Sequence, residues 1–185
     1  MTDSLGLLLA PGAGADRDQP ALVAIDRVAT EAGMVVVRMD FPYRKAGRRA
    51  PDRPPVLIGA VTEEANQLAG RVRRTVLGGR SMGGRICSMA VAMGLPGAGL
   101  VLISYPLHPP GRPDRLRTEH FSALDLPCLF VSGTRDAFAT PTELELATGT
   151  IRGRVTHRWI EGKDHGLRGT EQEVALIVVA WLADL

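Results

Sequence analysis

Short apolar runs that suit buried β-strands alternate along this chain with longer segments of helical periodicity. The apolar runs are residues 5–10, 34–39, 75–78, 99–104 and 126–132. Residues 154–160 alternate with period two, which indicates a sixth strand nearer the sheet edge. The amphipathic segments that separate and follow them are residues 18–32, 56–72, 82–94, 140–149 and 170–184. A parallel pair of strands needs a long crossover, which a helix usually supplies, so the alternation predicts a parallel sheet with helices on both faces. We therefore expect one domain over residues 1–185, a three-layer α/β/α sandwich with six mostly parallel strands.

The composition and charge of the chain argue against several classes of function. Hydrophobic residues make up 45% of the chain and the formal net charge is only +2, which offers no general basis for binding nucleic acid. The last apolar run, residues 174–182, falls short of the ~20 residues that a membrane span needs, and no basic leader precedes the first strand. Cys87 and Cys128 lack the spacing of metal ligands. These features predict a cytoplasmic protein with no membrane partner, no metal and no organic cofactor, and they leave monomer and homodimer open.

One serine lies among four glycines in the segment GGRSMGG, residues 78–84. The segment contains the pattern G-x-S-x-G and stands between a predicted strand and a predicted helix, which is the context of a nucleophile elbow. In such a sharp turn the backbones before and after the serine come close together, so glycine at positions 79 and 83 removes a clash. Ser81 would then stand above the sheet edge at a helix N-terminus, whose dipole favours developing negative charge.

A serine hydroxyl is a weak nucleophile and needs a base that takes its proton, oriented in turn by an acid. In folds with this elbow the chain order is serine, acid, histidine. Asp136 directly follows the fifth predicted strand and His165 the sixth, and the carboxyl ends of parallel strands meet at one edge of the sheet. Each feature alone has a simpler interpretation: a chance glycine-rich match, a turn aspartate, a surface histidine. Their joint order and placement predict a triad of Ser81, His165 and Asp136.

Acyl transfer also needs hydrogen-bond donors for the oxyanion of the tetrahedral intermediate. The backbone N–H of Met82 directly follows the serine and is one candidate. The loop after the first strand, PGAG at residues 11–14, supplies the other. We choose the N–H of Ala13 because Gly12 and Gly14 allow a close approach of the backbone.

Four further residues are candidates for lining a substrate pocket: Gly12, Arg80, His108 and Arg44. Arg80 flanks the serine, and His108 follows the fourth predicted strand. The two remaining histidines, His120 and His157, are expected to be structural or exposed.

The two long loops, residues 41–55 and 105–121, are rich in proline and arginine. Their basic residues are Arg44, Lys45, Arg48, Arg49, Arg53, Arg112, Arg115 and Arg117. Both loops follow strands, so these cations are expected around the site, where clustered charge would attract anionic substrates. The simpler interpretation, which we favour, is an arginine-rich surface whose cations pair with nearby carboxylates.

The chain resembles the α/β-hydrolase superfamily, above all its small dienelactone-hydrolase-like members. It is more similar still to a hydrolase-like family that includes testis-expressed and histone-acetyltransferase-complex proteins of animals. The segments that carry the resemblance are LLLAPGAGAD, DFPYRKAGRRAPDRPP, GGRSMGGR, SYPLHPPGRP, LFVSGTRDAF and GKDHGL.

The resemblance implies a minimal α/β-hydrolase fold without a cap domain, with strand order 2-1-3-4-5-6. It also implies that Ser81 is the nucleophile, Asp136 the acid and His165 the base. Relatives often carry His-Gly where this chain has Pro11-Gly12, so a side chain that can brace the oxyanion loop is missing here. Without a lid, the site would be open and suited to small or exposed substrates.

The favoured function is a serine hydrolase of small carboxylic esters or thioesters that forms an acyl-enzyme on Ser81. Because a fold does not dictate a function, a catalytically silent interaction module of the same fold is the alternative. A dinucleotide-binding βαβ unit is a third interpretation, since two glycines follow the first strand and Asp40 follows the second. In that pattern Arg17 occupies the place of the third glycine, where packing requires a small residue, and the serine turn has no role.

Overall fold

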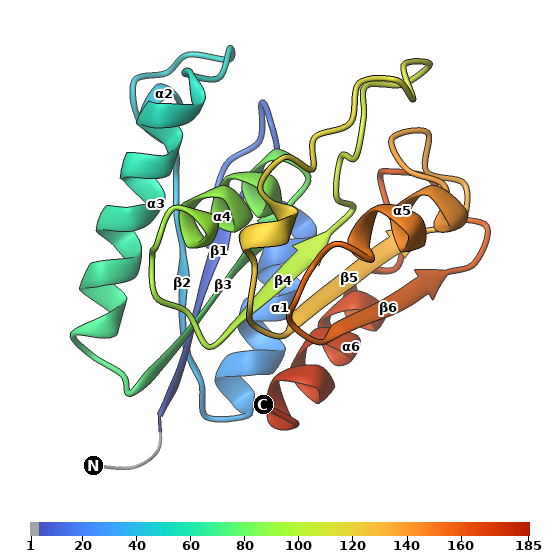
Figure 1. Ribbon diagram of the computed structural model, residues 1–185. Coiled ribbons are helices and arrows are strands. Elements are labelled where there is room, and N and C mark those ends of the chain that lie inside the picture. The colour runs from blue at the N-terminus through green and yellow to red at the C-terminus, as the bar shows by residue number, and fades with distance from the viewer. Residues whose placement is uncertain (1–3) are drawn as a thin grey trace.

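The structure, a computed structural model, describes residues 4–185 (Figure 1). Within that range six strands form one sheet in the order β2-β1-β3-β4-β5-β6, and every neighbouring pair is parallel. The strands are β1 Leu5–Ala10, β2 Val35–Arg38, β3 Arg74–Arg80, β4 Gly99–Ile103, β5 Cys128–Gly133 and β6 Val155–Ile160. The predicted α/β class and strand order are therefore confirmed.

Helices cover both faces of this sheet, which makes three layers (Figure 1). The helices are α1 Pro20–Glu31, α2 Pro42–Lys45, α3 Pro54–Ala69, α4 Met82–Ala92, α5 Pro141–Thr148 and α6 Glu171–Ala183, with a 3₁₀ turn at Phe121–Ala123. The helices α1 and α6 pack on one face, and α3, α4 and α5 pack on the other. Several begin with proline at the first helical position, where its missing N–H has no partner to lose.

The core consists of two apolar clusters, one on each side of the sheet. Successive side chains of a strand point to opposite faces, so Leu7 and Leu9 of β1 join the cluster under α1 and α6, while Leu8 joins the cluster under α3 and α4. Because both faces are covered, the central strands are buried along their whole length. This is why they read as continuous apolar runs in the sequence.

Several boundaries differ from the sequence prediction. The third strand runs two residues further than predicted, to Arg80, because Gly78 and Gly79 pair in register with β4 and β1. A Cβ on Gly78 would lie 2.6 Å from the carbonyl oxygen of Val101, so these glycines belong to a tightly approached strand and not to a turn. The loop predicted at 41–55 contains the short helix α2 and the start of α3, and the loop at 105–121 ends in the 3₁₀ turn.

The parallel strands bring their carboxyl ends to one edge of the sheet. The loops that follow β1, β3, β4, β5 and β6 leave from this edge, and they carry the residues of the site described below. In the part of the chain that the structure describes, no separate cap domain is inserted between these elements. None of the helices between residues 4 and 185 combines the length and the apolar character required to cross a membrane.

Candidate active site

The turn between β3 and α4 holds Ser81 in a strained backbone conformation, with φ 51° and ψ −116°. A non-glycine residue at such angles costs about 1–3 kcal/mol, and strain of this kind persists only where the surrounding structure enforces it. The enforcement is visible on both sides of the serine. Its N–H donates to the carbonyl oxygen of Ile103 at 2.8 Å, and its own carbonyl accepts from the N–H of Arg85 at 3.1 Å.

Glycine is required on both sides of this turn because the backbones touch. A Cβ on Gly79 or on Gly83 would overlap the carbonyl oxygen of Ala10, and one on Gly83 would also lie 2.6 Å from that of Pro11. The turn therefore packs directly against the loop after β1. The reason inferred from the sequence for glycine at positions 79 and 83 agrees with this packing.

A continuous chain of hydrogen bonds joins three side chains that are far apart in the sequence. The Ser81 hydroxyl lies 2.9 Å from Nε2 of His165, and Nδ1 of His165 lies 2.8 and 3.0 Å from the two carboxylate oxygens of Asp136. A carboxylate only accepts hydrogen bonds, so the ring proton belongs on Nδ1, and Nε2 is left to accept from the hydroxyl. This is the protonation that a general base at Nε2 requires.

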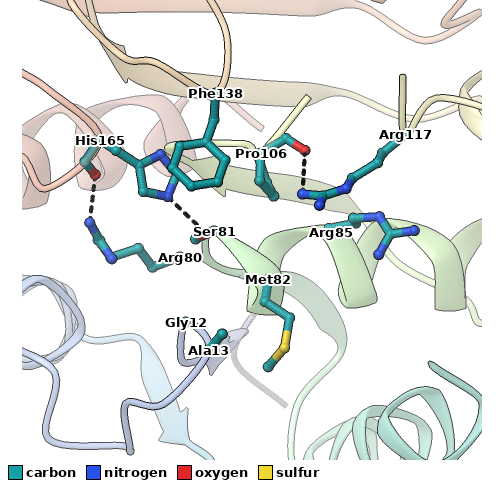
Figure 2. Close-up of a pocket in the computed structure, with 10 residues that line it drawn as sticks. All are labelled: Gly12, Ala13, Arg80, Ser81, Met82, Arg85, Pro106, Arg117, Phe138 and His165. Atoms are coloured by element: carbon teal, nitrogen blue, oxygen red, sulfur yellow. Dashed lines mark hydrogen bonds between the residues drawn. The ribbon is translucent and has the colours of Figure 1, made fainter. Parts of the chain in front are cut away.

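The chain's own groups hold Asp136 and His165 in place. The Asp136 side chain is fully buried and accepts a second hydrogen bond, from the N–H of Phe138 at 2.8 Å. The ring of Phe138 lies against the imidazole with centroids 4.1 Å apart (Figure 2). On the other side, the guanidinium of Arg80 donates to the carbonyl oxygen of His165. Burial lowers the pKa of Arg80, and the nearby carboxylates of Asp136 and Asp164 partly offset this effect.

The loop proposed to supply an oxyanion donor is braced by two side chains that the sequence did not suggest. The N–H of Gly12 donates to Oε1 of Gln19 at 3.0 Å, and the N–H of Gly14 donates to the hydroxyl of Tyr43 at 3.2 Å. Together with a turn from Ala15 to Gly12, these bonds leave the N–H of Ala13 unused among residues 4–185. Gln19 and Tyr43 thus do the bracing that Pro11 cannot.

Around Ser81 lies an open cavity of about 440 Å³, which we call the Ser81 pocket (Figure 2). It is lined by Gly12, Ala13, Arg80, Ser81, Met82, Arg85, Pro106, Arg117, Phe138 and His165. Both residues chosen as oxyanion donors, Ala13 and Met82, contribute to this lining, as do the predicted pocket residues Gly12 and Arg80. Arg85, Pro106 and Phe138 were missed, although Arg85 follows the serine by one helical turn, a spacing that brings side chains together.

Two predicted pocket residues lie elsewhere. His108 is buried, but its ring contacts the carbonyl oxygen of Pro109 at 2.9 Å and a carboxylate oxygen of Glu143 at 3.4 Å, at the start of α5. Its place directly after β4 was therefore a misleading signal, because the side chain turns away from the pocket. Arg44 is also outside the pocket, since its guanidinium reaches the carboxylate of Asp16 at 3.3 Å.

The eight basic residues of the two long loops divide into three groups. Four pair with a carboxylate, as the favoured interpretation predicted, in the pairs Arg44–Asp16, Lys45–Glu64, Arg48–Asp52 and Arg112–Asp114. Arg49, Arg53 and Arg115 form no ion pair with a carboxylate of residues 4–185. Arg117 instead enters the Ser81 pocket, where its guanidinium donates to the carbonyl oxygen of Pro106 at 3.2 Å.

Asp40 and the two cysteines, which were considered for a dinucleotide or a metal site, make contacts within the chain instead. Asp40 accepts from the backbone N–H and the guanidinium of Arg17 at 2.7 and 2.8 Å. Burial raises the pKa of Asp40, but these hydrogen bonds outweigh it and the net pKa is lowered. The cysteines are buried free thiols, and burial raises the pKa of each to about 12. Between residues 4 and 185 no cluster of three or more histidine, cysteine or acidic side chains has the arrangement of a metal site.

Comparisons with known proteins place this geometry in context. A family model described as an alpha/beta hydrolase domain matches residues 3–175. A metagenome-derived lipolytic enzyme superposes with a TM-score of 0.82 at 14% identity, covering 99% of this chain and 95% of its own. A hydrolase of the alpha/beta superfamily from Xanthomonas campestris superposes with a TM-score of 0.75 at 20% identity. The match covers 97% of this chain and 99% of that protein. The dienelactone hydrolase of Anabaena variabilis superposes with a TM-score of 0.78 at 18% identity. The match covers 99% of this chain and 87% of that protein. At these sequence identities the superpositions are evidence for the fold alone.

Proposed function

Because the chain belongs to the alpha/beta hydrolase domain family, we propose that it is a serine hydrolase that cleaves small carboxylic esters or thioesters through an acyl-enzyme on Ser81. The observation that supports this most is the unbroken relay from Asp136 through His165 to the Ser81 hydroxyl, with distances of 2.8 and 2.9 Å. A buried aspartate, an imidazole and a strained serine at a helix N-terminus are the components that activate a serine nucleophile.

In the first half of the proposed reaction, Ser81 Oγ attacks the ester carbonyl while Nε2 of His165 takes the hydroxyl proton. The Asp136 carboxylate holds the ring orientation and stabilises the imidazolium that forms. Negative charge develops on the carbonyl oxygen, and the N–H groups of Ala13 and Met82 stabilise it by donating hydrogen bonds to that oxygen. Losing one such donor typically costs a factor of about 10²–10³ in rate.

The same groups then work in reverse. The imidazolium gives its proton to the departing alcohol or thiol, and the C–O or C–S bond of the substrate breaks to leave the acyl group on Ser81. Water enters, His165 takes its proton, and the hydroxide attacks the acyl-enzyme. The collapse of the second tetrahedral intermediate returns the proton to Ser81 and releases the acid. No metal or organic cofactor takes part in this scheme.

The exchange of Ser81 for alanine tests the proposal directly. S81A is expected to abolish turnover of p-nitrophenyl butyrate, because removal of the nucleophile in such triads lowers kcat by up to about 10⁶. The melting temperature is expected to stay nearly unchanged. S122A, which alters an exposed serine of the 3₁₀ turn, is the matched control and should keep wild-type activity.

A fluorophosphonate probe separates the proposal from its alternative. Mass spectrometry of the labelled wild type should find the adduct on Ser81 and nowhere in S81A. Equal hydrolysis by wild type and S81A would contradict the proposal. A folded wild type that neither hydrolyses esters nor accepts the probe would point to a silent interaction module.

A further inference from the structure

Two arginines stand together in the Ser81 pocket on elements that hold them firmly. Arg85 lies one turn after Ser81 on α4, anchored by its N–H bond to the Ser81 carbonyl. Arg117 comes from the loop after β4, where its N–H donates to the Leu107 carbonyl at 2.8 Å and its carbonyl accepts from the hydroxyl of Tyr105 at 2.6 Å. Figure 2 shows both guanidinium groups at the same end of the pocket, across Ser81 from His165.

Neither of these arginines has an acidic partner. Within residues 4–185 no carboxylate forms an ion pair with Arg85 or Arg117, and Nε of Arg85 is buried without a hydrogen-bond acceptor. Burial and the positive charge of Arg85 together lower the pKa of Arg117. Two partly buried cations that repel each other are costly unless something negative joins them, because charges removed from water need a partner.

The neighbouring groups do not supply that partner. Glu119 acts on Arg117 only from a distance beyond ion-pair contact, and His120 is turned to the hydroxyl of Ser88 at 2.8 Å. Burial and then the charge of Arg85 lower the pKa of His120 to about 4, so at neutral pH it carries no charge. Among residues 4–185, the only hydrogen-bond acceptor of either guanidinium is the carbonyl oxygen of Pro106, which accepts from Arg117. The negative charge that fits here is therefore one that the substrate brings.

The position of the pair selects one side of the ester. His165 protonates the leaving group, so the leaving group must lie next to Nε2. The acyl chain extends to the other side of the carbonyl carbon, away from His165. Arg85 and Arg117 lie across Ser81 from His165 (Figure 2), which is where an acyl chain placed in this way would extend. We propose that Arg85 and Arg117 bind a carboxylate at the far end of the acyl chain, so that the preferred substrates are half-esters of dicarboxylic acids. This inference rests on the proposed serine hydrolase function.

Guanidinium chemistry suits this ligand. The planar fork of arginine matches a carboxylate with two parallel hydrogen bonds, and both Arg85 and Arg117 line the pocket. Charge-assisted bonds of this kind in a partly water-excluded site discriminate strongly against a neutral group of the same shape. The site would therefore favour an acyl chain that ends in a carboxylate over a neutral chain of the same shape.

A matched pair of substrates measures this selection. p-Nitrophenyl hydrogen adipate and p-nitrophenyl 6-methylheptanoate have acyl chains of the same shape, one ending in a carboxylate and the other in an isopropyl group. Wild type is expected to prefer the adipate in kcat/KM by about tenfold or more, which corresponds to about 1.4 kcal/mol. R85Q and R117Q should each reduce this ratio several-fold, and the double variant should bring it close to one.

Two further variants control for charge and for structure. R152Q removes one positive charge from an exposed position near the amino end of β6, at the opposite edge of the sheet, and should leave the ratio unchanged. R85K keeps the charge but loses the fork, so its ratio should lie between those of wild type and R85Q. A wild type that shows no preference for the adipate, or an R85Q/R117Q variant that keeps it, would overturn the inference.

A binding measurement separates this inference from the proposed function. S81A is expected to bind monomethyl adipate in calorimetry, more weakly as salt increases, and R85Q/R117Q in the S81A background should weaken binding at least tenfold. If S81A binds the half-ester in this way but no ester is hydrolysed by wild type, the carboxylate site stands and the hydrolase proposal fails. If Ser81-dependent hydrolysis occurs without arginine-dependent binding, the hydrolase proposal stands and the carboxylate site is refuted.

Discussion

Arginines of the outer surface and arginines of the Ser81 pocket have opposite surroundings. Beside α1 and outside the pocket, the half-buried Arg38 contacts two aspartates at 2.8 and 2.7 Å. The pocket arginines form no ion pair with any carboxylate of residues 4–185; they are Arg80, Arg85 and Arg117. An arginine-rich chain can therefore pair some of its cations with its own carboxylates and still leave others without an ion pair in the Ser81 pocket.

The two groups also differ in what their charge can achieve. An exposed ion pair in water typically contributes between about 0 and 1 kcal/mol, and salt screens it further. A cation in a partly enclosed pocket acts through a lower effective dielectric constant, so its interaction with a bound anion is stronger. The comparison predicts that surface arginines affect stability slightly, whereas pocket arginines affect activity and selectivity.

The largest effect is expected at Arg80, whose guanidinium holds the carbonyl of His165. R80A should lower kcat for a neutral ester by about 10- to 100-fold with a smaller change in KM, since a misplaced base slows proton transfer. R80K, which can still donate to that carbonyl, should restore part of the rate. Steady-state kinetics with p-nitrophenyl butyrate give both values.

The matched control for this prediction is R44A on the surface. The pair of Arg44 with Asp16 lies outside the Ser81 pocket, so kcat should change less than about twofold. If R44A and R80A reduced kcat equally, the division between surface and pocket arginines would lose its functional meaning.

A smaller effect is expected on stability, with opposite signs in the two groups. R38Q loses the contacts with two aspartates and should lower the free energy of unfolding by about 0.5–1 kcal/mol, less in high salt. R85Q loses no ion pair and relieves repulsion with Arg117, so its stability should stay level or rise. Urea unfolding of both variants at low and high salt measures the contrast. A clear loss of stability in R85Q that salt abolishes would mean that Arg85 has an acidic partner after all.

The smallest effect is expected at His120. Its pKa is lowered to about 4, mainly by burial and to a smaller extent by the charge of Arg85. R85Q should therefore raise this pKa, while R44A should leave it unchanged. The neutral ring contributes stability that is present above the unfolded pKa of about 6.5 and is lost as pH falls toward 4. R85Q should therefore lose less stability over that window. NMR titration of the imidazole protons checks the shift, and an unchanged pKa would show that Arg85 does not act on this ring.

Much of the architecture was predictable from local patterns. Apolar runs identified the first five strands, and a period-two alternation identified the edge strand β6. The superfamily resemblance, which the family match confirms, supplied the strand order. The serine turn was recognisable because a sharp turn demands glycine where backbones meet, at Gly79 and Gly83. Ser81, Asp136 and His165 were expected together because parallel strands end at one edge, and the structure brings their side chains into contact.

Other parts of the site had no local signal. Tyr43 braces the loop after β1 from a position 29 residues away from Gly14, which no spacing rule suggests. His108 follows a strand as Asp136 does, yet it turns toward α5. Arg44 and Arg117 have the same charge and the same long flexible side chain. The sequence alone therefore does not distinguish the arginine that pairs with Asp16 from the arginine that lines the pocket.

The amino-acid sequence by itself determined where strands and helices form and where the chain turns sharply enough to present a serine, because backbone sterics and burial periodicity act over a few neighbouring residues. Only the tertiary structure decided which cations are neutralised and which face the Ser81 pocket. Pairing of charges depends on distances of a few ångströms between residues that are remote in the chain, and those distances exist only once the sheet and its loops have assembled.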